Sequence, residues 1–372
     1  MKKICVITSV HQAYDGRIYH KQCKSLQKAG YDVTLVAPKP DAVLDDSIKI
    51  VPVEKPKSEL KRFLHTLTVM KTARKTGADL YHFHDPELIP AGTLLRIMTG
   101  KPVIFDAHEH YPNAIMSKKY LKRWLKKPVR FAYEMIEKIC LPILSGVIYT
   151  TDEVGERYQK YRSCKIENYP LTDMFSVRHD SQKDRSLVLY LGGITPIRGI
   201  RQMTEAFIMT ADKHPDAAFL FVGRFESEAF EREIKEMVEK SGHSDRITFA
   251  GSVPYSEIES YLSRASIGVI PYLPEPNHLV CLPNKLFEYM AAGIAVVASD
   301  FPHYRKVVEN SNSGRLVDPE SPSAIAGALS ALLENPGQAE SFGWNGRKSF
   351  ETVYNWESEE KKLTAFYRKL LK

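Results

Sequence analysis

Residues 282–299 read LPNKLFEYMAAGIAVVAS, a helix-forming segment followed by an apolar run. Pro283 favours the first turn of a helix, and the apolar run that ends at Ser299 is typical of a strand in a buried parallel sheet. Lys285 and Glu288 are three positions apart, so their side chains share one face of the predicted helix. A helix that leads directly into a buried strand predicts an α/β fold.

Strands and helices alternate in this way along the whole chain. Before residue 170, the strand-like runs are KKICVITSV, DVTLVAP, IKIVPV, ADLYHFH, KPVIFDAH and GVIYTT. After a polar, linker-like stretch at 171–185, the pattern restarts with SLVLYLGG, AAFLFVG, RITFAG, SIGVIPY, AVVAS and GRLVD. We therefore predict two doubly wound, Rossmann-like domains, 1–170 and 171–355, followed by an amphipathic helix at 356–372.

The composition favours a cytoplasmic enzyme. With 372 residues, of which 43% are hydrophobic, the chain is long enough for two cores. Five scattered cysteines without a CxxC pair argue against disulfides and thiolate metal sites, as in a reducing compartment. The apolar stretches at 139–148 and 294–298 are too short to cross a bilayer, and the N-terminus runs directly into a strand. We expect neither a spanning helix nor an export signal.

Several nucleotide-binding classes are disfavoured by their missing motifs. The first loop, SVHQAYDGRIYH at 9–20, lacks the GxGxxG of a dehydrogenase, and the chain has no P-loop. It also has no DxD to hold a divalent ion on a diphosphate. Two facing α/β domains place the carboxyl ends of their strands on one central cleft, so we expect a ligand site on each wall.

The loop GGITPIRG, which starts at Gly192, combines the features of a diphosphate site. Gly192 and Gly193 let the backbone approach a ligand closely. Arg198 and Gly199 stand at the start of a predicted helix, whose N-terminus attracts anions. Gly223, at the end of the next strand, belongs to the same predicted site. The alternative is a tight turn with a solvated arginine.

The helix after Leu282 supplies the second part of the predicted donor site. A carboxylate at Glu288 can bind a vicinal diol such as that of ribose. The alternative is a Lys285–Glu288 pair on a surface helix, which contributes little to stability. The residues of this segment assigned to donor binding are Pro283, Asn284, Lys285, Leu286 and Glu288.

Polar clusters follow two strands in the first half of the chain. These clusters are Asp106, His108, Glu109 and His110 after one strand, and His82, His84 and Asp85 after the other. Histidine with aspartate is a common metal-ligand set, but no cysteine, HExxH or DxD supports a metal here. We expect histidines that hydrogen-bond sugar hydroxyls or the acceptor, with purely structural histidines as the alternative for His82 and His84. The acceptor-side residues of these clusters are His84, His108 and Glu109.

Asp15, Gly16 and Arg17 complete the predicted acceptor side. They follow the first strand, and Gly16 permits a turn after which Arg17 begins a helix. A plain Asp-Gly turn is the alternative, because that dipeptide is a common turn signal.

The segment SKKYLKRWLKKPVR at 117–130 is strongly basic and contains no acid. As a helix it gathers Tyr120, Leu121, Trp124 and Leu125 on one side and the cations on the other, a pattern that suits an anionic membrane surface. The alternative is a surface helix that keeps the protein soluble. The residues predicted to face the membrane are Lys118, Lys119, Lys122, Arg123, Trp124, Lys126 and Lys127.

Over nearly its whole length, the chain resembles the retaining glycosyltransferases of the GT-B fold, specifically the family-four group. Residues 282–299 are similar to that family's nucleotide-sugar signature, GGITPIRG to its diphosphate loop, and DAHEHYP to the first-domain loop that faces the sugar. The resemblance implies that Glu288 binds the donor ribose, that Arg198 binds the diphosphate, and that Lys285 assists. It also implies that His108 lies beside the transferring sugar. The implied catalytic residues are His108, Arg198, Lys285 and Glu288.

The same resemblance implies retention of anomeric configuration, no metal cofactor, and a C-terminal helix that crosses back to the first domain. Two positions depart from the family pattern. The family has a glutamate eight residues before Glu288, where this chain has Val280, and Glu275 replaces it only if the loop is longer than usual. The family's diphosphate loop commonly has arginine where this chain has Gly193, which leaves Arg198 to act with Lys285.

We therefore predict transfer of a sugar from a UDP-, GDP- or dTDP-sugar to a glycan or lipid-linked acceptor in surface polysaccharide assembly. The predicted location is the cytoplasm, with peripheral attachment to the anionic inner face of the cell membrane. Three alternatives remain open: a nucleotide-sugar epimerase of the same fold, a non-catalytic nucleotide-sugar-binding subunit, and a nucleic-acid-binding protein. The last lacks any recognisable reading module, so we expect no nucleic acid partner.

Overall fold

The computed structural model describes residues 1–40, 42–54, 59–117, 121–172, 184–254 and 257–372. The chain forms two compact units, one of Met1–Asn168 with Trp356–Lys372 and one of Tyr169–Asn355. The ring of Tyr169 lies 4.6 Å from that of Phe287 and 5.6 Å from that of Tyr354, which anchors this residue in the second unit. Most of the predicted linker falls in 173–183, outside the described residues.

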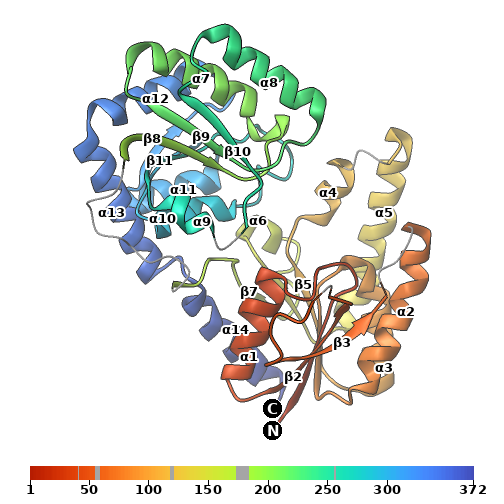
Figure 1. Ribbon diagram of the computed structural model, residues 1–372. Helices are drawn as coiled ribbons and strands as arrows, with labels where there is room; N and C mark the ends of the chain where they lie inside the picture. The colour runs from red at the N-terminus through yellow and green to blue at the C-terminus, as the bar shows by residue number, and fades with distance from the viewer. Residues whose placement is uncertain (41, 55–58, 118–120, 173–183, 255–256) are drawn as a thin grey trace. The chain divides into compact units, whose positions relative to one another are not determined.

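The first unit is built on a seven-stranded parallel sheet in the order β3-β2-β1-β4-β5-β6-β7 (Figure 1). Its strands are β1 Lys3–Ile7, β2 Asp32–Pro38, β3 Lys49–Val53, β4 Leu80–Phe83, β5 Val103–Ala107, β6 Gly146–Tyr149 and β7 Ser163–Lys165. Its helices are η1 Gly16–Cys23, α1 Lys24–Lys28, α2 Glu59–Lys75, η2 Pro86–Leu88, α3 Ile89–Thr99, α4 Tyr111–Ser117, α5 Arg123–Cys140, η3 Leu141–Ile143, α6 Asp152–Gly155 and α14 Trp356–Leu370.

The second unit contains a six-stranded parallel sheet in the order β10-β9-β8-β11-β12-β13. Its strands are β8 Asp184–Leu191, β9 Ala218–Val222, β10 Ile247–Gly251, β11 Ala265–Ile270, β12 Ala295–Ser299 and β13 Gly314–Val317. Its helices are η5 Pro196–Arg198, α7 Ile200–Lys213, α8 Glu228–Ser241, α9 Ile258–Leu262, α10 Asn284–Ala291, α11 Pro302–Ser311, α12 Pro322–Glu334 and α13 Pro336–Thr352.

The apolar strands fold as they do because both faces of each sheet are covered. β12 is fully buried, as expected for a central strand of a parallel sheet with helices on both sides. The same reasoning fails for β7, which the sequence did not predict. That strand has only three residues, reads SCK and lies at the sheet edge, so its sequence carries no apolar alternation.

The C-terminal helix α14 packs on the first unit, against η1, α1 and β7 (Figure 1, blue). The indole of Trp356 is fully buried, and its Nε1 donates a hydrogen bond to Oγ of Ser25 at 2.8 Å. The carboxylate of Glu359 accepts a hydrogen bond from the backbone nitrogen of Glu167 at 3.0 Å. The last residues of the chain therefore complete the core of its first half.

The basic segment at 117–130 is not one helix, so this part of the sequence prediction is wrong. Helix α4 ends at Ser117, and α5 begins at Arg123 after Lys122, whose backbone is extended with φ −57° and ψ 139°. Lys118, Lys119 and Tyr120 lie outside the described residues. Because Leu121 precedes the helix, it does not share a helical face with Trp124. Among the helices of the described chain, none is long and apolar enough to cross a membrane.

Replacing Trp356 tests whether α14 is integral to the first unit. We expect Trp356→Ala to lower the free energy of unfolding by about 3–5 kcal/mol, because the large cavity it leaves cannot collapse. Trp124→Ala is the matched control, since that indole is 70% exposed, and it should change stability by less than about 0.5 kcal/mol. Urea unfolding followed by circular dichroism measures both. Equal losses in the two variants would contradict this account of α14.

Candidate functional site

The glycine turn after β8 and the helix α10 meet in the second unit. Nη1 of Arg198 donates a hydrogen bond to the carbonyl oxygen of Gly193 at 3.2 Å. A Cβ atom placed on Gly192 would lie 3.0 Å from the same nitrogen and 3.7 Å from Cε of Lys285. The structure thus brings together two cations and a side-chain-free backbone turn that the sequence assigned to one site.

Two glycines of this region have no tolerable substitute. Gly223 has φ +153°, and a Cβ there would lie 1.8 Å from the carbonyl oxygen of Gly192. Gly199 has φ +71°, caps the start of α7, and would place a Cβ 2.2 Å from the carbonyl oxygen of Pro271. The end of β9 therefore lies against the turn after β8, and the start of α7 against the end of β11, so closely that only backbone fits between them.

Helix α10 presents the predicted ribose-binding carboxylate. Nζ of Lys285 lies 2.9 Å from Oε2 and 3.2 Å from Oε1 of Glu288. Glu288 is only 6% exposed, so this pair differs from the surface pair that the sequence offered as the alternative. Pro283 is the N-cap residue and Asn284 is exposed, whereas Leu286 is fully buried in the core. The side chain of Leu286 is therefore unavailable to a donor, and only its backbone remains for binding.

Tyr190 and Tyr272 are parts of this site that the sequence analysis missed. The hydroxyl of Tyr190 donates to the carbonyl oxygen of Gly193 at 2.7 Å, and the guanidinium of Arg198 lies 5.5 Å from the ring centre of Tyr272. Burial raises the pKa of both phenols, so they remain protonated. Both tyrosines could have been found from the sequence, because Tyr272 is the last residue of the strand-like run SIGVIPY and Tyr190 lies two residues before the glycine turn.

The segment that holds Glu275 and Val280 joins β11 to α10. Nδ1 of His278 lies 3.0 Å from the carbonyl oxygen of Leu273, and its ring lies 4.9 Å from that of Tyr272. The segment thus folds back on the end of β11. Glu275 is half-buried within it, five residues before Val280, and its proposed replacement of the missing glutamate stays a prediction.

In the first unit, five of the six predicted acceptor-side residues line one pocket of about 310 Å³, and Gly16 is the exception. The lining includes Asp15, Arg17, His84, Asp106, His108 and Glu109 together with the rings of Phe105, Tyr111 and Tyr133. The pocket opens where β1, β4 and β5 end, as expected for parallel strands. The sequence therefore identified residues that the fold brings together from three separate loops.

Asp15 has a definite structural role here. Its Oδ1 accepts hydrogen bonds from the backbone nitrogens of Arg17 and Ile18 at 2.8 and 2.9 Å, which caps η1. That element is a π-helix beginning at Gly16, not the regular helix expected. This π-helix spans eight residues and directs the Arg17 side chain to Asp106. Asp15 therefore caps a helix, and the binding role of this loop stays a prediction.

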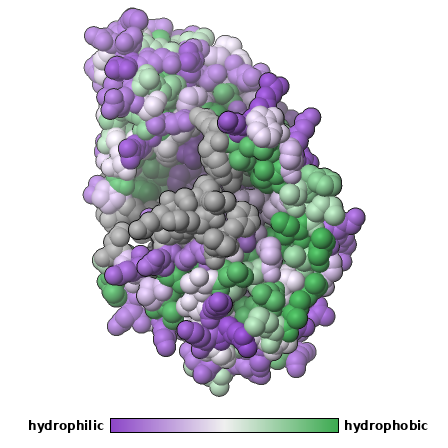
Figure 2. All heavy atoms as spheres, turned by 90° about the vertical axis from the view of Figure 1, so that its right-hand side faces the viewer, coloured by the Kyte–Doolittle hydropathy of each residue, from purple (hydrophilic) through white to green (hydrophobic). Residues whose placement is uncertain are grey.

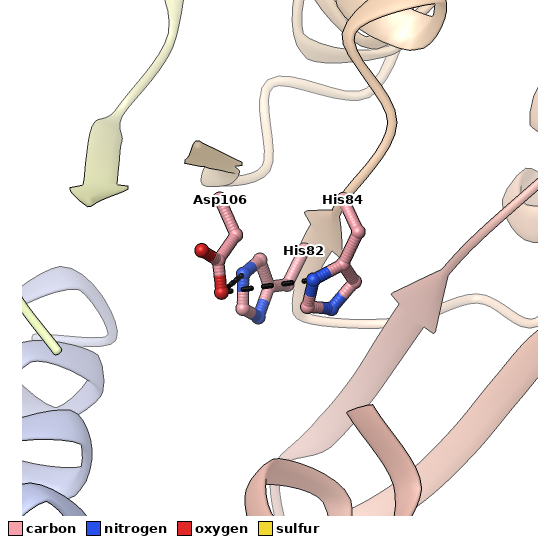
Figure 3. Close-up of side chains that lie close together, drawn as sticks. All are labelled: His82, His84 and Asp106. Atoms are coloured by element: carbon pink, nitrogen blue, oxygen red, sulfur yellow. Dashed lines mark ion pairs between the residues drawn. The ribbon is translucent and has the colours of Figure 1, made fainter. Parts of the chain in front are cut away.

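The buried carboxylate of Asp106 organises the floor of the pocket. Nη2 of Arg17 donates to its two oxygens at 3.0 and 3.1 Å, and Nε2 of Gln22 donates to Oδ2 at 2.6 Å. As Figure 3 shows, ring nitrogens of His82 and His84 both lie 3.6 Å from Oδ2. The sequence analysis placed Asp106 only in a metal-like cluster. Asp106 is the charged residue of the otherwise apolar strand β5, and this position could have indicated a buried, paired carboxylate.

Electrostatics explain how this carboxylate stays ionised. Burial opposes the charge of Asp106, but Arg17 and then His108 more than offset that effect and hold its pKa well below the ordinary value. Burial also lowers the pKa of His82, and lowers that of His84 further because His82 lies beside it. His82 and His84 are therefore neutral, whereas Arg17 and Asp106 form an ion pair with no net charge.

The same cluster bears on the metal question. His82, His84 and Asp106 offer ligand atoms within 4.8 Å of one another. The Arg17 guanidinium already neutralises this carboxylate, so a second cation would be repelled by a fixed positive charge 3.0 Å away from its ligand. The expectation that this cluster holds no metal stays a prediction.

His108 connects the network to the pocket. Its Nδ1 lies 3.2 Å from Oδ1 of Asp106, and its ring stacks on that of His84 with centroids 5.0 Å apart. The hydroxyl of Thr150 donates to its carbonyl oxygen at 2.9 Å. The imidazole is 20% exposed, so it is fixed on one side and open on the other.

Two sequence profiles match the chain. The profile described as Glycosyl transferases group 1 matches residues 172–349, and that of Glycosyltransferase Family 4 matches residues 16–167. A phosphatidyl-myo-inositol mannosyltransferase of Mycolicibacterium smegmatis is 24% identical over 323 residues, which cover 83% of this chain and 78% of the relative.

Solved structures agree in fold. Sucrose-phosphate synthase from Thermosynechococcus elongatus superposes with a TM-score of 0.76 at 22% identity, covering 100% of this chain and 99% of that one. The Anabaena protein HepE, in complex with UDP and glucose, gives a TM-score of 0.75 at 14% identity and covers 99% and 100% of the two chains.

Two Rossmann-like units with this topology and a C-terminal helix on the first unit define the chain as a GT-B glycosyltransferase. It belongs to the group 1 family, with the family-four profile matching its first half. The resemblance drawn from the signature and the glycine turn is thereby confirmed.

Asp106→Asn tests the charge at the pocket floor. The ionised carboxylate has a depressed folded pKa, so its stabilisation is present above the ordinary range and is lost as the pH falls through the folded value. We expect a loss of about 3–5 kcal/mol at neutral pH, and a difference from the parent that shrinks below about pH 4. Urea unfolding across this pH range measures it.

Asp216→Asn is the control, because Asp216 is exposed in the second unit and its replacement should leave stability unchanged. A difference between Asp106→Asn and the parent that persists undiminished in acid would contradict the assigned charge state.

Proposed function

We propose that this glycosyltransferase moves a sugar from a nucleoside-diphosphate sugar to a glycan or lipid-linked acceptor, with retention of anomeric configuration. The observation that carries the proposal is the convergence of Arg198 and Lys285 on the turn at Gly192. Cations held beside a glycine turn suit the charge that develops on a departing diphosphate.

The donor site has two parts in this proposal. The glycine turn and Arg198 bind the diphosphate, while Glu288 binds the ribose diol from the next helix. Lys285 lies between these parts, 2.9 Å from the Glu288 carboxylate, and turns toward the phosphates when the donor enters. The UDP and glucose bound by HepE support a nucleotide-sugar donor, which we propose to be a UDP-, GDP- or dTDP-sugar.

We further propose that no metal cofactor takes part. The positive charge that the leaving diphosphate requires comes from Arg198 and Lys285, which are already held beside the turn. Arg198 is the fixed member, because it stacks over Tyr272 and bonds to Gly193. Activity in this proposal persists in the presence of EDTA, and all transfer assays below include it.

The acceptor in this proposal binds at the pocket of the first unit. His108 and Glu109 line that pocket and offer hydrogen bonds to a hydroxyl group, while Tyr111 and Tyr133 add aromatic surface for a sugar ring. The acceptor hydroxyl attacks from the face that the diphosphate leaves, and the leaving phosphate oxygen takes its proton. The phosphatidyl-myo-inositol relative supports a lipid-linked acceptor.

The surface of α5 supports attachment to a membrane. Trp124, Phe131 and Ile139 recur along one face of the helix and are 70%, 65% and 63% exposed. Exposed apolar residues of the contacting elements α3 and η3 enlarge this surface, and Figure 2 shows hydrophobic patches beside strongly polar ones on this side. These additional residues are Leu94, Ile97 and Met98 of α3 and Ile143 of η3, and α5 itself adds Met135. Large exposed apolar patches mark interaction sites.

The cations around this apolar face differ in availability. Lys122, Arg123 and Lys127 are exposed at the start of α5. Lys126 donates to the carbonyl oxygen of Met116 at 2.7 Å, so it fastens α4 instead of facing lipid. We therefore propose an anionic bilayer as the partner, with the apolar face entering it and the three exposed cations at its headgroups.

Glu288→Gln tests the donor site by thermal shift. Selective binding of a nucleotide sugar raises the melting temperature of the parent, because ligand that binds only the folded state stabilises it by mass action. The screen covers UDP, GDP, dTDP, ADP and CMP and their common sugar conjugates. We expect one nucleotide class to produce a shift that Glu288→Gln abolishes, with transfer reduced at least about a hundredfold by loss of a charged contact.

The control is Glu228→Gln, an exposed glutamate in the first turn of α8. It should retain both the shift and the transfer. No shift with any nucleotide would overturn the proposed donor site, a shift without sugar transfer would leave a binding subunit, and conversion of the free donor would reveal an epimerase.

Vesicle flotation tests the membrane surface. The parent should float with vesicles containing phosphatidylglycerol and remain in solution with phosphatidylcholine alone. The pair Phe131→Ser and Ile139→Ser should lower the bound fraction at least about tenfold, since burying each side chain contributes about 1.5–3 kcal/mol.

The control removes two exposed apolar side chains of the second unit, Met209→Ser (41% exposed) and Val353→Ser (54% exposed), and should float like the parent. Failure of the parent to float at low salt would exclude the membrane proposal and leave the donor proposal untouched.

A further inference from the structure

A second cavity, of about 610 Å³, lies in the first unit where the strands β5 and β6 begin. Pro102 of its lining stands directly before β5, and Gly146 and Val147 are the first residues of β6. The acceptor pocket is lined by Asp106, near the other end of β5. The second cavity therefore lies at the opposite end of this strand from the acceptor pocket.

The lining of this cavity carries positive charge. Three cations line it, namely Arg96 of α3 and Lys160 and Arg162 of the segment before β7. No aspartate or glutamate of the described residues accompanies them in the lining. A hollow lined by charges of one sign attracts ions of the opposite sign, so the cavity favours an anion.

Most of the donors on these cations are not used inside the protein. Nη1 of Arg96 donates to the carbonyl oxygen of Gly100, and the ammonium of Lys160 lies 5.1 Å from the ring centre of Tyr161. Within the described part of the chain, the guanidinium of Arg162 makes no hydrogen bond or ion pair. Its backbone is held at the sheet, because its carbonyl oxygen accepts from the nitrogen of Val147 at 2.9 Å.

Ser145 adds a neutral donor to the cavity wall. Its Oγ accepts a hydrogen bond from the backbone nitrogen of Val103 at 3.1 Å, and its own nitrogen donates to the carbonyl oxygen of Val103 at 2.9 Å. The hydroxyl proton has no acceptor among the described residues. A phosphate group suits this set of donors better than a carboxylate, because it offers more acceptor oxygens and a larger charge.

Exposed apolar side chains directly follow two lining residues in the chain. Arg96 precedes Ile97 and Met98, which are 65% and 51% exposed, and Pro142 precedes Ile143, which is 40% exposed. An ester that joins a phosphate to acyl chains would thus pass from the cations onto apolar surface. The headgroup of an anionic lipid and a free phosphorylated small molecule both present the phosphate oxygens that the cavity suits.

We propose that this cavity binds a phosphate group through its three cations, with the hydroxyl of Ser145 as a further donor. The phosphate belongs either to a lipid headgroup or to a free small molecule, and the test below separates these two sources. The inference goes beyond the proposed sugar transfer, because it uses no residue of the donor site or the acceptor pocket. It also needs no attachment of α5 to a membrane, since the cavity binds phosphate in solution.

Nitrogen-15 NMR of protein labelled at its arginine side chains tests the proposal, because each Nε–H group gives its own signal. The signals of Arg96 and Arg162 are assigned from Arg96→Lys and Arg162→Lys. Titration with inorganic phosphate at constant ionic strength should shift both signals, with a Kd of about 1 mM or lower. Arg74, exposed near the end of α2, is the internal control, and its signal should stay in place.

A second titration identifies the source of the phosphate. Its probe is dihexanoylphosphatidylglycerol, a short-chain lipid that remains in solution. Saturation of the Arg96 and Arg162 shifts at a lower concentration than with inorganic phosphate would identify a lipid headgroup as the ligand. The reverse order would identify a free phosphorylated molecule.

Lys160→Gln tests the third cation without removing an arginine signal. It should weaken phosphate binding about tenfold, the effect of one charge-assisted hydrogen bond. Lys75→Gln, at an exposed lysine of α2, is the matched control and should bind like the parent.

Arg96 and Arg162 signals that do not move with either probe would overturn the proposal, as would an equal shift of Arg74. Phosphate binding by Lys160→Gln with the affinity of the parent would also overturn it, and this exposed substitution should leave the fold intact. Absence of sugar transfer would instead contradict the proposed function, because none of these NMR signals comes from the donor site.

Discussion

The ion pair between Arg17 and the buried carboxylate of Asp106 is the interaction on which the first unit's site depends. A lone carboxylate in that position would be neutral, because burial opposes its charge. With Arg17 beside it, the carboxylate stays ionised, and the neutral rings of His82 and His84 lie around it. The π-helix η1 begins at a cap formed by Asp15, and it carries Arg17 to this carboxylate.

The second unit depends on close backbone packing instead. Gly223 lets the end of β9 lie against the turn after β8, and Gly199 lets the start of α7 lie against the end of β11, where no side chain fits. The hydroxyl of Tyr190 donates to Gly193 in the turn, and the ring of Tyr272 packs against the guanidinium of Arg198. The first unit thus orders side chains around a charge, whereas the second has no side chains where its backbone segments meet.

Much of the fold could be predicted because the strands of a buried parallel sheet appear in the sequence as continuous apolar runs. Twelve strand-like runs and the restart of the pattern follow from burial on both faces of each sheet. β7 was not predicted, because a three-residue edge strand needs no apolar alternation. The prediction for the basic segment was wrong because the spacing of its charges fits one helix, whereas the extended backbone of Lys122 interrupts it.

Periodicity, glycine turns and the Lys285–Glu288 spacing are local properties, so the two-unit α/β fold and the residue types of each site follow from the sequence. Three contacts required the folded chain: Arg17 with Asp106, Tyr272 with Arg198, and Tyr367 with His82. These contacts join positions tens to hundreds of residues apart. Their existence depends on which strands are neighbours and how α14 packs, and no local pattern encodes either.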